Sequence, residues 1–194
     1  MKNMPESAAL IAGEGALPEE TARQMAGSGM DVTVYSFTGG AEKRFPFLPE
    51  DRVLSLLSLP GGEGKLSLRA LLADLRDRGI RSVCMAGLIP KALMYGTSAD
   101  ASLLGMLSPG GNDDHSLLGR IVAAFESFGL QVLPYAEFVR ESLAAEGFLA
   151  GRAATEQERE DVKYGKRILS VTLPLSFGQA VVVARLPADS HGDF

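Results

Sequence analysis

The sequence predicts an α/β protein, with a Rossmann-like parallel sheet that carries helices on both faces. Three strand-to-helix alternations support this prediction, because a parallel sheet needs a crossover helix between its strands. The chain has 194 residues, of which 46% are apolar and 22% charged, so it is long enough to bury a real core. No repeat of fixed period and no low-complexity tract interrupts the pattern.

The first 37 residues are typical of one βαβ unit. Residues 8–12 form a short apolar run that ends at Gly13, and residues 18–26 carry helix formers with Pro18 near the first turn. Residues 31–37 (DVTVYSF) are rich in β-branched and aromatic side chains, which favours a second strand.

The middle of the chain continues the alternation. Leucines at helical spacing, with Gly79 as the stop, predict a helix over residues 65–78. Residues 53–59 are ambiguous, and a short strand is one interpretation. The remaining predicted elements are a strand over 81–89, helices over 98–107 and 116–128, and a strand over 130–133.

After Tyr135 the pattern changes from sheet-forming units to a helical linker. We expect helices over 136–145 and 156–169, a loop over 147–154 and a short strand over 178–184. The predicted domains are therefore a Rossmann-like N-terminal domain (1–134), a helical linker with the start of a truncated second module (135–184), and a disordered tail (185–194).

Composition excludes some classes of partner and location. The net charge of −5 and the lack of a Lys/Arg stripe argue against nucleic-acid binding. A single cysteine, Cys84, rules out an internal disulfide framework and fits a reducing compartment, where it acts as a small buried hydrophobe. The N-terminus has no signal-peptide core and no window is apolar enough to span a bilayer, so we expect a cytoplasmic protein.

The glycine turn after the first strand is a candidate phosphate cradle, formed by Gly13, Glu14, Gly15 and Ala16. Glycines let backbone approach an anion, and the following helix directs N–H groups at it. The turn is only G-x-G-x-x-P, and the second strand ends in Ser36-Phe37 without an acid for a ribose, so an NAD-dependent oxidoreductase is disfavoured. A purely structural tight turn remains an equal alternative.

A second group of candidates lies at the next strand end and at the head of a later helix. Gly87 and Lys91 follow a strand, where a cation can meet a phosphate. Asp113 and Asp114, beside His115, have the oxygen ligands that Mg²⁺ prefers, although simple helix capping explains them equally well. No Ser-His-Asp elbow, Walker lysine loop, zinc spacing or HExxH motif is present, so the catalytic and metal-binding residues stay unassigned.

Several separated segments resemble a known family. They are LIAGEGALP, AGLIPKALM, NDDHSLLGRIVAAFESFG followed by LQVLPYAEF, AGRAATEQEREDVKYGKRI and SFGQAVVVA. In this order and spacing, over roughly residues 8–184, they resemble the N-terminal part of the LpxI-type UDP-2,3-diacylglucosamine diphosphatases (pyrophosphatases) of lipid A biosynthesis.

The resemblance implies an activity, a cofactor and partners. The family hydrolyses UDP-2,3-diacylglucosamine to UMP and 2,3-diacylglucosamine 1-phosphate with Mg²⁺, and holds the lipid product between two domains. It implies that the substrate or its 1-phosphate product is the ligand here, with transient contact to the inner-membrane surface and possible homo-oligomers as further expectations. The positions taken as substrate-binding are Gly13, Glu14, Gly15, Ala16, Gly87, Lys91, Asp113, Asp114 and Gln179.

The chain departs from the family pattern after GQAVVVA. The family continues there into a C-terminal domain with an E-G-T-D-type motif that serves the metal chemistry, whereas this chain reads RLPADSHGDF. We therefore expect it to bind substrate without the full catalytic site. The alternative hypothesis is a non-catalytic module that binds a nucleotide or a sugar phosphate.

Overall fold

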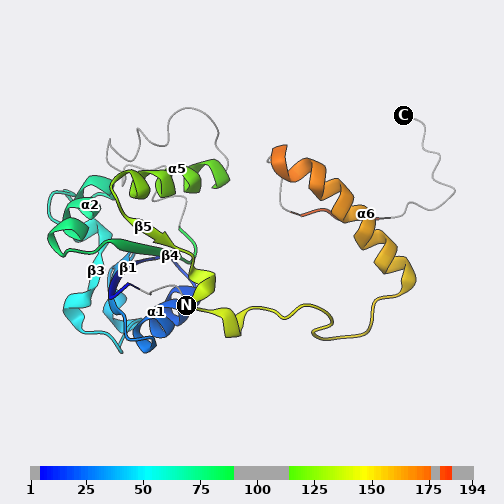
Figure 1. Cartoon of the computed structure of the whole chain (residues 1–194), viewed down its shortest axis with the longest axis horizontal. Coiled ribbons are helices and arrows are strands. Elements are labelled where there is room, and N and C mark those ends of the chain that lie inside the picture. Colours follow the sequence, from blue (N-terminus) through cyan, green and yellow to red (C-terminus); the bar gives the residue numbers. More distant parts are fainter. Residues whose placement is uncertain (1–4, 90–113, 176–179, 185–194) are drawn as a thin grey trace. The chain divides into compact units, whose positions relative to one another are not determined.

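The computed structural model describes residues 5–89, 114–175 and 180–184. The chain divides into two compact units, Met1–Leu143 and Ala144–Phe194, and each is described by itself (Figure 1). The predicted helix over 98–107 lies outside the described residues.

Unit 1 is built on a five-stranded sheet in which every pair of neighbouring strands is parallel. The strands are β1 (Ser7–Ala12), β2 (Asp31–Ser36), β3 (Val53–Ser55), β4 (Ser82–Ala86) and β5 (Gln131–Leu133), in the order β3-β2-β1-β4-β5. The order reverses between β1 and β4, which makes the carboxyl ends of these two strands the topological switch point. The predicted Rossmann-like fold class is confirmed.

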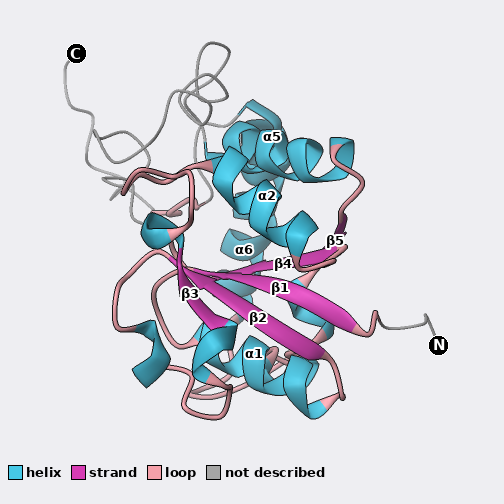
Figure 2. Cartoon of the chain, turned by 90° about the vertical axis from the view of Figure 1, so that its left-hand side faces the viewer, coloured by secondary structure: helices cyan, strands magenta, loops and turns pink. Residues whose placement is uncertain are grey.

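Helices cover both faces of this sheet. Helices α2 (Leu68–Asp77) and α5 (Asp114–Ser127) lie over one face, and α1 (Leu17–Gly27) lies over the other (Figure 2). Because side chains alternate along a strand, Ile11 contributes to the core under α2 and α5, whereas Leu10 contributes to the core under α1.

One buried polar contact ties the sheet to α2. The Tyr35 side chain on β2 is fully buried, and its hydroxyl donates a hydrogen bond of 2.6 Å to Oδ2 of Asp74. The same oxygen accepts a 2.8 Å bond from Nε of Arg78, so Asp74 has two donors. The phenol is thereby satisfied inside an otherwise apolar core.

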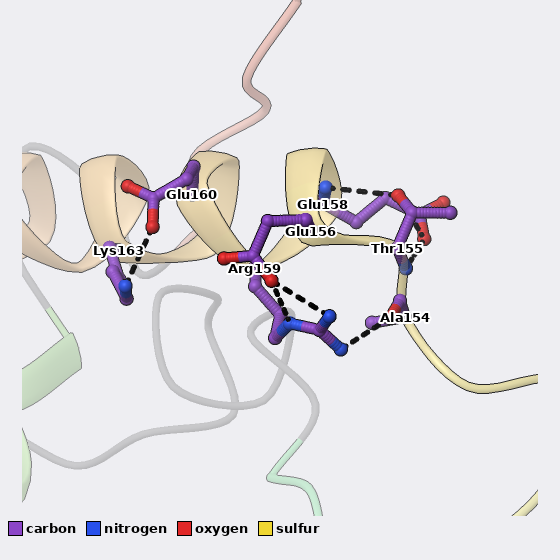
Figure 3. A network of polar contacts seen from close by, with 7 residues as sticks. All are labelled: Ala154, Thr155, Glu156, Glu158, Arg159, Glu160 and Lys163. Carbon is purple, nitrogen blue, oxygen red and sulfur yellow. Dashed lines mark hydrogen bonds and ion pairs between the residues drawn. The ribbon is translucent and has the colours of Figure 1, made fainter.

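Unit 2 contains α6 (Glu156–Thr172), whose start is fixed by a capping box. Thr155 Oγ1 accepts from the Glu158 backbone N–H at 3.2 Å, and the Glu158 carboxylate accepts from the Thr155 N–H at 2.8 Å (Figure 3). Further along, Gly165 is the buried residue of α6, and a Cβ built there comes within 3.4 Å of Val181 and Val183. The charged helix predicted over 156–169 is confirmed.

Two C-terminal segments differ from the sequence prediction. Residues 136–145 form no α-helix; they contain two short 3₁₀ turns, Tyr135–Glu137 and Arg140–Ser142. Residues 141–145 are all exposed, so a helix there would bury no apolar face, and a short helix without such packing is marginal in water. In the segment predicted as a strand, residues 180–184 have no strand partner within the described part of the chain.

Candidate functional site

The candidate site lies at the switch point, where the loop after β1 meets the loop after β4. The Gly13 N–H donates to Ala86 O at 2.8 Å, and the Glu14 N–H donates to Leu88 O at 2.7 Å. Leu88 returns a bond of 3.1 Å from its N–H to Glu14 O, so the two loops form an antiparallel bridge. The sequence-predicted residues Gly13, Glu14 and Gly87 are thus brought together.

Two of the glycines are required by this close approach of backbone to backbone. A Cβ on Gly13 would lie 2.5 Å from Leu88 O and 2.8 Å from the carbonyl carbon of Gly87. Gly87 has φ of +90°, and a Cβ there would lie 2.7 Å from Glu14 O. Gly13 therefore makes room for the β4 loop, and its N–H is already used.

Gly15 differs from these two glycines. It is exposed, its φ is +91°, and no atom lies within 4 Å of a Cβ built on it. The next residue, Ala16, is the N-cap of α1 and supplies no side-chain hydrogen bond to the helix. An α-helix without a side-chain cap leaves backbone N–H groups at its start that can donate hydrogen bonds to an anion. Gly15 and Ala16 therefore form the part of the turn that is open to a ligand.

Arg44 fixes the turn from the outside, and the sequence analysis missed it. Its guanidinium donates from Nη1 to Gly13 O at 3.2 Å and from Nη2 to Gly15 O at 2.8 Å. Its Nε donates to the Glu19 carboxylate on α1 at 3.0 Å. One planar side chain therefore binds both ends of the turn and the helix that follows. Arg44 is about 30 residues distant from the turn in sequence, and no local pattern marks it.

The other predicted site residues are placed only in part. Lys91, Asp113 and Gln179 lie outside the described residues. Asp114 begins α5, but only its backbone is described. Within residues 5–89, 114–175 and 180–184, no three His, Cys, Asp or Glu side chains lie together as a metal site.

A small apolar cavity lies beneath the switch point, on the side of α2 and α5. Its volume is about 60 Å³, which equals the space of roughly two water molecules. Ile11 and Met85 line it at the ends of β1 and β4, together with Phe125 of α5. Most of its lining residues belong to the apolar core under α2 and α5.

Cys84 lies on β4 close to the same loops but faces the core under α1. Its side chain is fully buried, and burial raises the pKa of its thiol to about 12. A thiol with that pKa is almost entirely protonated at neutral pH and is a poor nucleophile. The prediction of an inert buried cysteine agrees with this placement.

The fold and the interlocked loops define the class: a parallel α/β domain with its candidate ligand-binding turn at the switch point. The sequence model of the LpxI N-terminal domain family matches residues 7–142, most of the chain, and this chain belongs to that family. The match ends next to Leu143, the last residue of unit 1. It relates the protein to lipid A biosynthesis.

Two further observations concern relatives and membrane-crossing helices. No curated protein matches the chain in a sequence search. Across the described segments, no helix combines the length and apolarity that crossing a bilayer requires.

Proposed function

We propose that this chain supplies the ligand-holding N-terminal domain of a UDP-2,3-diacylglucosamine diphosphatase and binds UDP-2,3-diacylglucosamine at the switch point. The family match over residues 7–142 carries the proposal. In this proposal the pyrophosphate lies against the exposed Gly15-Ala16 end of the turn, where the N-terminus of α1 begins.

The geometry of the turn supports this choice of subsite. Gly13 and Glu14 have committed their N–H groups to the β4 loop, so the ligand has to be met further along, at Gly15 and Ala16. Arg44 pairs with Glu19 in the first turn of α1 and so offsets the negative charge of that carboxylate. Its two bonds to Gly13 O and Gly15 O hold the turn in shape before the ligand arrives, which lowers the entropy cost of binding.

Hydrolysis of the bound substrate is part of the same proposal, with Mg²⁺ as the expected cofactor. No catalytic step is assigned to the described residues. Their role is to bind and orient the anionic part of the substrate.

The test adds a negative charge at the proposed subsite without harming the fold. In Ala16→Asp, a carboxylate stands at the N-terminus of α1, where the helix dipole stabilises it by about 0.3–1 kcal/mol. The same carboxylate repels a pyrophosphate. Calorimetric titration with UDP-2,3-diacylglucosamine is expected to show binding to the unaltered chain and about tenfold weaker binding to Ala16→Asp.

The matched control is Ala153→Asp, which adds the same charge in an exposed loop of unit 2. It should bind as the unaltered chain does. Equal affinity in both variants, or no binding by the unaltered chain, would rule out the switch-point site. Titration with UMP and with UDP-N-acetylglucosamine separates the alternative: a module for nucleotides or sugar phosphates binds these as well as it binds the diacylated compound.

A further inference from the structure

A second open surface lies at the opposite edge of the sheet, where the strands begin. Two equivalent helix-to-strand turns form it. Gly79 follows α2 and leads into β4, and Gly129 follows α5 and leads into β5; their φ values are +70° and +77°. In each turn the residue after glycine donates its N–H back to the helix, Ile80 to Leu75 O at 2.9 Å and Leu130 to Phe125 O at 3.0 Å.

Between these turns lies a groove of about 880 Å³. Its lining combines apolar and cationic side chains and contains no acidic residue. The apolar part includes Leu72, Leu130 and Phe128, whose side chain is 66% exposed directly after the end of α5. The cationic part consists of three guanidinium groups, from Arg69, Arg76 and Arg81.

Helix electrostatics do not explain this set of arginines. Arg76 is in the last turn of α2, where the dipole favours a cation, and it also contacts the exposed Asp77 carboxylate at 3.2 Å. Arg69, however, is in the first turn of α2, at the end that disfavours positive charge, and Arg81 precedes β4. A chain with a net charge of −5 thus gathers three cations around exposed apolar surface.

We propose that this groove docks unit 1 on an anionic phospholipid bilayer, with the three arginines on lipid phosphates and Phe128 among the acyl chains near the headgroups. Interfacial binding depends on buried apolar area together with attraction to anionic lipid, and the groove offers both. Apart from the guanidinium groups, the lining side chains are apolar, which suits acyl chains close to the headgroups.

The experiment measures sedimentation of the full chain with vesicles of phosphatidylcholine alone and with vesicles containing 30% phosphatidylglycerol. Binding is expected only to the anionic vesicles. Neutralising Arg69, Arg76 and Arg81 to Gln should lower partitioning by about a hundredfold, since each cation at such a surface strengthens binding severalfold. The matched control changes Arg23, Arg140 and Lys166 to Gln, three exposed cations that do not line the groove.

A second readout tests insertion directly. The chain contains no tryptophan, so Phe128→Trp introduces a single reporter whose emission should shift to the blue with anionic vesicles. Equal losses in both triple variants, an unshifted emission, or no vesicle binding by the unaltered chain would overturn the proposal. So would groove-dependent binding of monomeric dihexanoyl-phosphatidylglycerol, or of poly-uridylate, without binding to vesicles. These results do not depend on the switch-point site, because Ala16→Asp should bind vesicles unchanged.

Discussion

The two units of this chain hold their structure by different means. In unit 1, five parallel strands bury apolar side chains on both faces, and contacts between residues far apart in sequence fix the turns. In unit 2, the described polar contacts around α6 join residues at most six positions apart, and Gly165 is its buried helical residue. The family match covers residues 7–142, which lie in unit 1, and ends next to the boundary of that unit at Leu143.

This difference predicts how each unit responds to change. A substitution in unit 1 disturbs packing that the whole sheet shares, so its effect should be large and cooperative. A substitution at the start of α6 removes contacts within one or two turns, so its effect should be small and local. The following four predictions test this contrast.

The largest effect is expected from Gly13→Ala. The added methyl group would lie 2.5 Å from a backbone oxygen, Leu88 O, which cannot move without opening the bridge between the two loops. We expect the free energy of unfolding to fall by about 3 kcal/mol or more, measured by urea denaturation. The control is Gly27→Ala, where a Cβ meets open space at the end of α1; it should be neutral or stabilising by up to about 1 kcal/mol. Equal stability of the two variants would contradict the close approach.

A smaller effect is expected from Tyr35→Phe, which removes the phenol hydroxyl and leaves the ring in place. Asp74 keeps its bond to Arg78, so no buried carboxylate is left without a donor. We therefore expect a loss of about 1 kcal/mol at neutral pH.

The buried phenol of Tyr35 should also make the free energy of unfolding depend on pH in the alkaline range. Burial, and then the hydrogen bond to Asp74, raise the pKa of the phenol well above its ordinary value of 10.0. The folded state retains this proton while the unfolded state loses it, so the stabilisation is complete below pH 10 and falls as the pH rises further. Urea denaturation from pH 8 to 11 should show a steeper decline for the unaltered chain than for Tyr35→Phe. Tyr135→Phe, at an exposed site, should keep the steeper decline.

The sequence predicted the fold well because its strands and helices are marked by local patterns, such as the β-branched run of β2 and the leucines of α2. The sequence marked Gly13 as a candidate site residue but did not show why glycine is needed there. The reason is the close approach of Leu88, which only the order of the strands in the sheet brings near. Arg44 was missed for the same cause, since its partners Gly13 and Gly15 lie about 30 residues away. The helix predicted over 136–145 was wrong because residues 141–145 are exposed and bury no helical face, which the local pattern of residue types did not reveal.

The smallest effect is expected at the start of α6, where acid should loosen the capping box. A hydrogen bond from Arg152, followed by that from the Thr155 N–H, lowers the pKa of Glu158 to about 2 from its ordinary 4.5. The carboxylate form of Glu158 is favoured when the start of α6 is intact. Its stabilisation of the helix start is therefore fully present above pH 4.5 and is lost as the pH falls through about 2. The protection factors of the amides at residues 156–160, measured by hydrogen exchange and corrected for the intrinsic exchange rate at each pH, should fall over that range.

Glu158→Gln should show the lower protection factors already at pH 6, and these should change little on acidification. Glu160→Gln is the matched control, because Glu160 pairs with Lys163 but takes no part in the cap. In both variants the amides of β1 should keep their protection, since those are held by the shared core of unit 1. Loss of protection in β1 on substitution of Glu158 would show that the capping box supports more than its own helix.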